Sequence, residues 1–366
     1  MKDICQITMH YFPRSGGQDT YVQQLIDLFE KKELSHSVVQ PVKSKVEYPK
    51  FVKTLLRVPL IKQLKSGSNW FWFNFALIFE KGFLKNHKIL ISHYAFHLKS
   101  LQFHKKVIVI SHGVDWPDNP KNIFDKTKYL SARRAVSLNG KNIIIVANDS
   151  NFLRKMGYKI KPAQNFYEEI DENVWFVPNA VDLNYFKRSK KPREKIILVP
   201  RNIRKSRGVD IAIESFIKFS KKKKYNDFKL LIAGGPLKGD FYKKCFKLSK
   251  KNKNIKFLGN IDYKKMNDLY RKSMVTLIPT RNYEGTSLSA LESIACGTPV
   301  ISTKAGGLAD LPTFKTTTRS SRMAKDLEII INKSNDFAEK QYLTVKNIFN
   351  IKKWNQAWIK IISEEL

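Results

Sequence analysis

The sequence predicts an α/β protein built from two Rossmann-like, doubly wound domains in tandem. The chain has 366 residues, which is more than one ordinary hydrophobic core serves. In both halves, short apolar runs alternate with segments of helical periodicity, as is typical of parallel sheets covered on both faces. Glycine-bearing turns follow several of the apolar runs, where a strand would pass into a helix.

The elements follow this alternation in order. The first half opens with an expected strand at 4–9, a turn at Gly16–Gly17 and a helix with apolar residues at helical spacing. Further strands of this half are expected at 38–39, 88–92, 107–110 and 143–147. The second half repeats the scheme, with strands expected at 195–199, 229–233, 254–258, 275–279 and 299–302 and helices at 209–219, 263–272 and 287–296.

A polar, proline-containing connector at 187–194 marks the boundary between the two domains. We therefore expect a first Rossmann-like domain at 1–185, a second at 186–345, and a C-terminal helix at 346–366 packed back on the first domain. In open α/β sheets, ligands bind beyond the carboxyl ends of the strands. Two such domains in tandem predict a site in the cleft between them.

The composition is strongly basic. Lysine and arginine number 67 against 32 acidic residues, a formal net charge of +35. Such an excess attracts polyanions, including nucleic acid and acidic membranes. The lysines are scattered through every segment, so a functional and a purely compositional origin of the charge remain equally open. No basic stripe or recognised module indicates specific nucleic-acid binding.

Cysteine usage and hydropathy indicate a cytoplasmic protein. The three cysteines, Cys5, Cys245 and Cys296, are dispersed, which argues against a disulfide framework and a zinc site. The opening residues are typical of a first strand rather than a signal peptide. No apolar run reaches the roughly 20 residues that cross a bilayer.

The segment 283–292 carries the strongest chemical signal. It follows an expected strand and opens a helix, whose free N–H groups and dipole suit a diphosphate. Gly285 permits close approach of the backbone. Glu284 precedes the helix and can accept hydrogen bonds from sugar hydroxyls, whereas Glu292 lies along it and can reach a ribose. The carboxylate pair alone also fits a capped helix with two solvated glutamates.

The run from Glu284 through Gly306–Gly307, including 295–301 (ACGTPVI), resembles the retaining GT-B glycosyltransferases of the family 4-like group 1 class. That family carries two glutamates separated by seven residues. The resemblance implies that Glu284 contacts the donor sugar and Glu292 the ribose. It also implies that Gly285, Thr286, Ser287 and Leu288 lie around the diphosphate. By the same resemblance, the domain at 1–185 would bind the acceptor and the domain at 186–345 the nucleotide sugar.

The loop 200–209 has a strand end, basic residues and a helix start. By itself it also fits a solvated basic loop. The resemblance places a lysine and an arginine of this loop on the diphosphate. Arg207 takes the place of the lysine, and bidentate phosphate contact suits an arginine. The other position falls on Asn202 if the glycine sets the register, or on Arg201 one residue earlier.

Other positions are assigned through the resemblance as well. Gly16 and Gly17 would lie over the donor phosphates, and Gly234, Gly259 and Ile261 near the nucleotide. His112, which follows the strand at 107–110, would lie near the transferred sugar, although a structural loop histidine is an equal alternative. The expected catalytic residues are thus His112, Glu284 and Arg207.

The implied reaction is retaining and metal-independent transfer from a nucleotide-diphosphate sugar, with no further cofactor. No Asp-x-Asp motif supports a metal site. The protein would then act by positioning the substrates and stabilising the leaving group. The alternatives are a nucleotide-sugar epimerase of the same fold and a nonenzymatic polyanion-binding protein.

The acceptor is expected to be a glycan or a lipid-linked glycan of cell-surface polysaccharide or lipopolysaccharide synthesis. The stretch 43–65 mixes lysines with apolar residues, and aromatic residues follow at 70–75. Such a stretch can lie on an anionic membrane surface. An amphipathic helix packed on the sheet is the alternative. We therefore expect a cytoplasmic protein that associates peripherally with the inner face of the plasma membrane.

Overall fold

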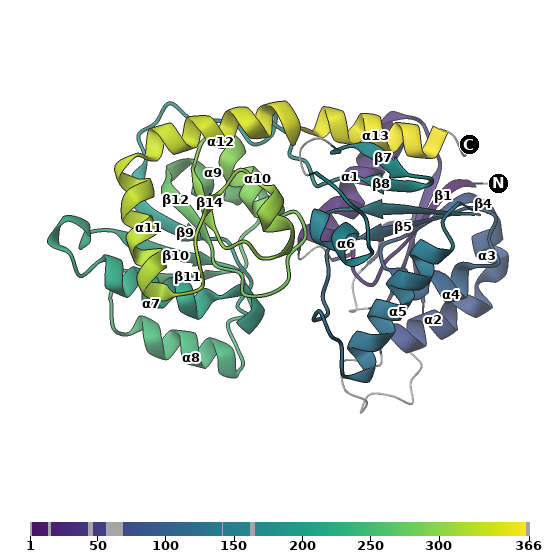
Figure 1. Ribbon diagram of the computed structural model, residues 1–366, viewed down its shortest axis with the longest axis horizontal. Coiled ribbons are helices and arrows are strands. Elements are labelled where there is room, and N and C mark those ends of the chain that lie inside the picture. Colours follow the sequence, from purple (N-terminus) through teal and green to yellow (C-terminus); the bar gives the residue numbers. More distant parts are fainter. Residues whose placement is uncertain are drawn as a thin grey trace. The chain divides into compact units, whose positions relative to one another are not determined.

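The computed structural model describes residues 2–13, 16–42, 47–55, 69–140, 142–161 and 165–363. It divides into two compact units. Unit 1 comprises Met1–Pro178 and Trp354–Leu366, and unit 2 comprises Asn179–Lys353. The first division falls before the boundary expected at 185/186. Each unit is built on a mainly parallel sheet, which confirms the predicted α/β class with two Rossmann-like domains (Figure 1).

The described strands of unit 1 form one sheet in the order β3-β2-β1-β4-β5-β6-β8-β7. Neighbouring strands are parallel except β7 and β8. The apolar runs recognised in the sequence form its central strands and are almost entirely buried. The strands are β1 (Lys2–Ile7), β2 (His36–Pro41), β3 (Val52–Leu55), β4 (His87–Ser92), β5 (Val107–Ser111), β6 (Ile143–Ala147), β7 (Glu168–Asp171) and β8 (Val174–Phe176).

The helices of unit 1 include the last helix of the chain. Trp354, Trp358 and Ile361 form its buried stripe. The indole of Trp358 donates a hydrogen bond to the Tyr21 hydroxyl at 3.1 Å. The helices are α1 (Gly17–Lys31), α2 (Asn69–Phe79), α3 (Lys81–Lys85), η2 (Ala95–His97), α4 (Leu98–Leu101), α5 (Ile123–Ser137), α6 (Ser150–Lys155) and α13 (Ile351–Ser363).

The expected single helix at the C-terminus is interrupted. The segment contains α12 (Ser334–Ile348) and α13 instead. The backbone between them bonds elsewhere: Val181 N–H donates to Phe349 O at 2.9 Å, and Ile351 N–H donates to Val181 O at 3.1 Å. These bonds replace continuous helical pairing at the junction, a long-range effect that helical periodicity does not reveal.

The described strands of unit 2 form a fully parallel sheet in the order β11-β10-β9-β12-β13-β14. Its core combines aliphatic strand residues with apolar faces of the flanking helices, including Phe216 and Leu327. The strands are β9 (Glu194–Val199), β10 (Lys229–Ala233), β11 (Ile255–Gly259), β12 (Ser273–Ile278), β13 (Val300–Ser302) and β14 (Phe314–Lys315).

The helices of unit 2 form two groups around this sheet. In one group α7 packs on α8 and α11, and in the other α10 packs on α9 and α12. Figure 1 shows the strands between α8 and the pair α9 and α10. The helices are η3 (Lys205–Arg207), α7 (Val209–Phe219), η4 (Lys223–Tyr225), α8 (Asp240–Ser249), α9 (Tyr263–Lys272), α10 (Leu288–Ala295), η5 (Gly306–Asp310), α11 (Ser320–Asn332) and α12.

Each sheet has a topological switch point, where the chain leaves one side of the sheet for the other. In unit 1 it lies between β1 and β4, and in unit 2 between β9 and β12. Ligands of open α/β sheets bind beyond the carboxyl ends of the strands at such points. The segments that follow these four strands contain most of the predicted site residues.

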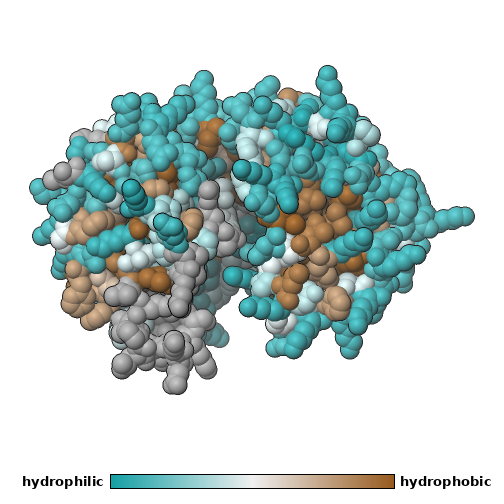
Figure 2. Space-filling view, turned by 180° about the vertical axis from the view of Figure 1, so that it is seen from behind, coloured by the Kyte–Doolittle hydropathy of each residue, from teal (hydrophilic) through white to brown (hydrophobic). Residues whose placement is uncertain are grey.

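The surface is polar over most of the face shown in Figure 2, and hydrophilic residues spread across each unit. Among the described residues, no helix is long and apolar enough to cross a membrane. Within the basic stretch 43–65, Val52–Leu55 forms the strand β3 rather than part of an amphipathic helix. Residues 43–46 and 56–65 of that stretch lie outside the described residues. The aromatic run at 70–75 lies on α2.

Candidate functional site

Two arginines and a glutamate converge at the switch point of unit 2. Arg201 follows β9, Arg207 ends the short helix η3, and Glu284 lies in the loop between β12 and α10. Both guanidinium groups donate to Oε2 of Glu284. Arg201 Nη1 also lies 3.3 Å from Glu284 Oε1, and its Nη2 donates to the Thr280 hydroxyl at 2.9 Å. The predicted Glu284 and Arg207 thus belong to one cluster.

The charge of this cluster is only partly balanced. Two guanidinium groups and one carboxylate leave one net positive charge. The side chain of Arg201 is 7% exposed and that of Glu284 10%, whereas that of Arg207 is 34% exposed. Burial alone would raise the pKa of Glu284, but the two arginines hold it below its ordinary value. The cluster therefore presents Arg207 as its accessible cation, beside an ionised carboxylate.

Glycines bring the backbone of this loop into close contact with its neighbours. A Cβ atom on Gly306, whose φ is +52°, would lie 2.1 Å from the carbonyl oxygen of Glu284. The N–H of Gly307 donates to that same carbonyl at 2.8 Å. At Gly208, with φ of +69°, a Cβ would lie 1.9 Å from Pro279 O. These positions accept only glycine without displacing the backbone that carries Glu284 and Arg207.

Glu292, on α10, forms a second polar pair with Tyr270, on α9. Its side chain accepts a hydrogen bond from the Tyr270 hydroxyl at 2.9 Å. Glu292 is 7% exposed and Tyr270 1%. Burial raises the pKa of Glu292 to about 7, although the bond from Tyr270 opposes the shift. Glu292 is therefore a carboxyl group that changes charge near neutral pH.

The other predicted donor residues of unit 2 lie at or after the carboxyl ends of β9, β10, β11 and β12. A Cβ on Gly234 would lie 2.3 Å from Arg201 O, and the Gly234 N–H donates to Gly259 O at 2.7 Å. Asn202 is exposed, and Ile261, after β11, is half-buried. Gly285, Thr286 and Ser287 complete the loop before α10, which begins at Leu288.

The predicted residues of unit 1 lie beyond β1 and β5. Gly16 precedes α1 and donates its N–H to Asp19 at 3.1 Å, and Gly17 is the first residue of that helix. His112 follows β5, and its Nε2 lies 2.9 Å from Nδ1 of His93. The ring of Tyr21 contacts His112 edge-on at a centroid distance of 4.9 Å.

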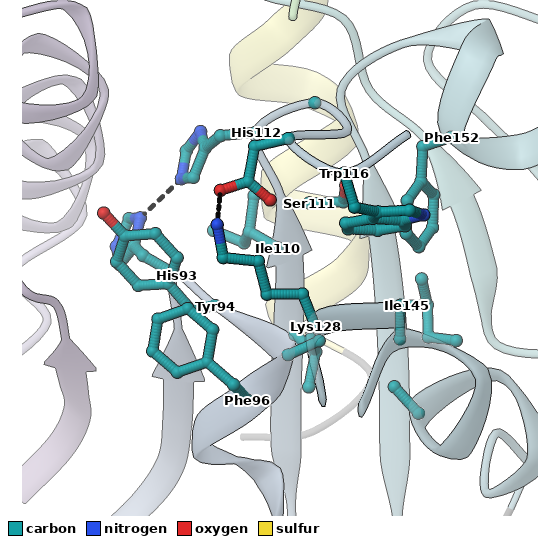
Figure 3. A pocket seen from close by; sticks show the side chains of 16 residues that line it. His93, Tyr94, Phe96, Ile110, Ser111, His112, Trp116, Lys128, Ile145 and Phe152 are labelled. Carbon is teal, nitrogen blue, oxygen red and sulfur yellow. Dashed lines mark hydrogen bonds and ion pairs between the residues drawn. The ribbon is translucent and has the colours of Figure 1, made fainter. Parts of the chain in front are cut away.

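A pocket of ≈ 160 Å³ opens beside His112 in unit 1. Figure 3 shows Tyr94 and Phe96 on one side of it and Trp116 on the other. The ion pair of Lys128 with Asp115 lies at its wall. Aromatic faces with a few polar groups are suited to bind a sugar ring or another partly apolar ligand.

Sequence reasoning left two features of the site unresolved or unseen. Arg201, which the glycine register disfavoured, contacts Glu284 together with Arg207, while Asn202 is exposed. Thr280 and Tyr270 were not recognised. Thr280 follows the apolar strand β12 and Tyr270 is a buried residue of α9, so neither carries a local signal. Their contacts join segments distant in the sequence.

Within the described part of the chain, no group of three or more His, Cys, Asp or Glu side chains could hold a metal ion. The free cysteines Cys5, Cys245 and Cys296 are buried.

Sequence comparison points to unit 2. Residues 182–313 match the family model described as glycosyl transferases group 1. An uncharacterized glycosyltransferase of Methanocaldococcus jannaschii is 31% identical over 119 residues. This region makes up 32% of the present chain and 29% of that relative, so less than a third of the relative is matched. The family match confirms the resemblance carried by the glutamate-bearing segment.

Structural comparison extends over the whole chain. Sucrose-phosphate synthase from Thermosynechococcus elongatus superposes with a TM-score of 0.78 at 15% identity, covering 100% of this chain and 99% of that one. The Anabaena protein Alr3699/HepE, solved in complex with UDP and glucose, gives a TM-score of 0.74 at 16% identity and covers both chains completely. These likenesses establish the GT-B fold.

Proposed function

We propose that this chain, whose unit 2 matches the group 1 glycosyltransferase model, is a retaining glycosyltransferase that uses a nucleotide-diphosphate sugar. The observation that carries the proposal is the convergence of Arg201 and Arg207 on Glu284 at the switch point of the unit 2 sheet. This arrangement places an accessible guanidinium next to an ionised carboxylate. The guanidinium group suits a diphosphate, and the carboxylate can accept hydrogen bonds from sugar hydroxyls.

Arg207 would exchange partners when the donor binds. In the free protein its guanidinium group donates to Glu284. A diphosphate offers more charge and more acceptor oxygens than one carboxylate, so Arg207 would turn to it. Arg201, which is buried and also bonded to Thr280, would keep Glu284 in place. The carboxylate of Glu284, with one donor fewer, would then accept from hydroxyls of the transferred sugar.

The remaining contacts follow from the chain's own geometry. The loop 285–287 and the start of α10 would supply backbone N–H groups to the diphosphate. Glu292 would accept from the ribose hydroxyls. The Anabaena protein was solved with UDP, and other structures of it contain UDP alone or UDP-glucose, which supports a nucleotide-sugar donor here. For Gly16 and Gly17, at the start of α1, a role toward the donor phosphates is proposed from the sequence resemblance alone.

In the proposed reaction an acceptor hydroxyl attacks the anomeric carbon from the face that the diphosphate leaves. The bond from that carbon to the phosphate oxygen breaks as the new glycosidic bond forms. The proton of the acceptor passes to the departing diphosphate, so charge and atoms balance. Arg207 and the N–H groups of the loop would stabilise the negative charge on the leaving group. The anomeric configuration is retained because attack and departure share one face.

The proposed acceptor is a glycan or lipid-linked glycan, reached at the cytoplasmic face of a membrane. The chain's formal charge of +35 favours an anionic surface. In unit 1, α2 exposes the apolar side chains of Phe75, Ile78 and Phe79. Basic and apolar exposure together suit peripheral binding. The aromatic pocket beside His112 would receive a ring of the acceptor or the transferred sugar.

Ligand-dependent thermal stability tests the donor site first. UDP, GDP and ADP, and their common sugars, would be added to the wild type, to Glu292→Ala and to Glu194→Ala, whose glutamate is exposed at the start of β9. We expect one nucleotide diphosphate to raise the melting temperature of the wild type and of Glu194→Ala, but not of Glu292→Ala. Absence of any shift in folded wild type would reject the donor site.

Product analysis tests the reaction itself. With the donor identified, slow turnover onto water or a model acceptor is expected to release the sugar with retained configuration, followed by NMR of the anomeric proton. Activity is expected to persist in EDTA. Conversion of the nucleotide sugar into an epimer without release of the nucleotide would favour an epimerase instead.

A further inference from the structure

Three side chains form a hydrogen-bonded row at the carboxyl end of the unit 1 sheet. Gln6 lies on β1, His93 follows β4 and His112 follows β5. Because β1, β4 and β5 are neighbours in the sheet, the three side chains meet at one edge. Gln6 and His93 are fully buried. His112 stands at the end of the row and lines the pocket of unit 1 (Figure 3).

The direction of each hydrogen bond in the row follows from the first one. The amide nitrogen of Gln6 donates to the backbone carbonyl of Val22 at 3.4 Å, so its Oε1 faces His93. That oxygen is 2.9 Å from Nε2 of His93. Since the oxygen accepts only, Nε2 of His93 must carry the proton.

The same logic fixes the second ring. In a neutral imidazole only one nitrogen carries a proton, so Nδ1 of His93 is an acceptor. Nε2 of His112 lies 2.9 Å from it and must therefore donate. The two rings are parallel within 2°, which suits this in-plane bond. The remaining nitrogen of His112, Nδ1, then has a free lone pair.

Both rings are neutral. Burial lowers the pKa of His93 well below its ordinary value, and it lowers the pKa of His112 to about 3. Figure 3 shows the second ring nitrogen of His112 pointing away from His93. Nδ1 of His112 can therefore accept a hydrogen bond from a hydroxyl group, but it cannot donate one to a phosphate or a carboxylate.

We propose that Gln6 and His93 are positioning residues that hold His112 in its Nε2–H tautomer, so that Nδ1 accepts a hydrogen bond from a hydroxyl of the sugar substrate. The identity of the ligand rests on the proposed function, but the tautomer does not. The row makes the wall of the site selective for an uncharged, hydroxyl-bearing ring. It also gives a role to the glutamine that is buried between Cys5 and Ile7 in the central strand β1.

Replacing Gln6 with an apolar residue is expected to exchange the donor and acceptor roles along the row. In Gln6→Leu, a proton on Nε2 of His93 would be buried without an acceptor, which is costly. The proton moves to Nδ1, His93 becomes the donor toward His112, and the proton of His112 must shift to its Nδ1. Gln6→Glu keeps an acceptor for His93 and should preserve both tautomers. Gln40→Leu is the matched control, because Gln40 is also fully buried but bonds to the backbone of Phe12.

The experiment reads the tautomers directly by NMR of full-length protein with ¹⁵N-labelled histidine, assigned with His93→Gln and His112→Gln. In wild type, Gln6→Glu and Gln40→Leu, both rings are expected to carry the proton on Nε2. In Gln6→Leu, both should carry it on Nδ1. A wild-type His112 protonated on Nδ1 overturns the proposal without need of a folded variant, as does a folded Gln6→Leu with unchanged tautomers.

Kinetics on the same proteins test the consequence. Gln6→Leu should lower kcat for transfer roughly 10- to 100-fold, with unchanged affinity for the nucleoside diphosphate, whereas Gln6→Glu and Gln40→Leu should remain near wild type. Unchanged kcat in a Gln6→Leu protein with reversed tautomers would overturn the positioning role. If wild type shows the expected tautomers but neither binds nucleotides nor transfers sugar, the proposed function fails while the assignment of the row stands.

Discussion

The hydroxyl of Tyr270 donates a hydrogen bond to Oε2 of Glu292 at 2.9 Å, in an environment that excludes nearly all solvent from both side chains. Tyr270 comes from α9 and Glu292 from α10, so the bond also joins two helices on one face of the unit 2 sheet. The single donor does not offset the burial of the carboxyl group, whose pKa rises to about 7. In this residue, which is expected to bind ribose, burial therefore disfavours the charged form before the ligand arrives.

We predict that Glu292→Gln stabilises the ligand-free protein above neutral pH. The folded-state pKa of about 7 exceeds the ordinary value of 4.5, so the folded protein binds the proton more tightly. The stability that the neutral carboxyl contributes is complete below pH 4.5 and is lost as the pH rises to 7. Glutamine stays neutral, so the variant should exceed wild type by roughly 3 kcal/mol at pH 8.

Chemical denaturation at several pH values checks this prediction. The two proteins should be equally stable near pH 4, and the gap should open between pH 5 and pH 7. The variant should meanwhile bind the nucleotide more weakly, because the ribose loses an ionised acceptor. A constant gap at all pH values would contradict a titrating Glu292.

Arg207 is expected to carry much of the leaving-group stabilisation. Arg207→Ala should lower kcat/KM for the donor roughly 100-fold, and Arg207→Lys should lower it less because the charge remains without the planar fork. Arg204→Ala, in the same loop with an exposed side chain, is the matched control and should stay near wild type. Steady-state kinetics at two salt concentrations distinguish a specific contact from general charge loss. Equal defects in Arg204→Ala and Arg207→Ala would speak against the assigned role.

Gly306→Ala should destabilise unit 2 and weaken donor binding together. The added Cβ meets the carbonyl oxygen of Glu284 at 2.1 Å, and φ of +52° is itself unfavourable for alanine. We expect a loss of about 2–4 kcal/mol. Gly157→Ala separates the two causes, because Gly157 has φ of +98° but no atom within 4 Å of the added Cβ. That control should lose about 1 kcal/mol and keep nucleotide binding, as measured by denaturation and calorimetry.

The bond from Trp358 to Tyr21 should couple the last helix to the wall that holds His112. Trp358→Phe and Tyr21→Phe each remove this buried bond and should each cost about 1–2 kcal/mol. The double variant should cost less than the sum, since the second change removes a bond already lost. Urea denaturation of the four proteins of the cycle measures the coupling. Simple additivity would show that the bond contributes nothing beyond packing.

The fold could be predicted because each unit repeats a local pattern. Buried parallel strands require apolar runs such as 143–147, and the helices between them require an apolar stripe, so the order of elements is visible in the sequence. The interruption between α12 and α13 could not be predicted, because it depends on Val181, distant in the chain. Edge elements such as β7, with mostly exposed polar residues, also lack the apolar signal.

The candidate site was predictable only where local chemistry marks it. Glu284 and Gly285 lie at a strand-to-helix turn, a context that identifies them. For Arg201, the glycine register favoured the neighbouring Asn202 instead. In the structure, the position of Arg201 just after β9 brings it to Glu284. A role for Gln6 and His93 could not be predicted, because it depends on hydrogen bonds between residues at the ends of three different strands.

Membrane association should depend on the apolar face of α2 in unit 1. Phe79 is 73% exposed, and a basic protein that inserts such a ring beside anionic lipids gains both charge attraction and apolar burial. Phe79→Ser should therefore reduce cosedimentation with vesicles rich in anionic lipid at physiological salt. Phe246→Ser, which removes an exposed ring on α8 of unit 2, is the matched control and should bind as wild type does. Equal loss of vesicle binding in both variants would indicate unspecific hydrophobic adsorption. If the wild type does not bind vesicles at physiological salt, charge alone attracts the protein at lower salt, and insertion of α2 is rejected.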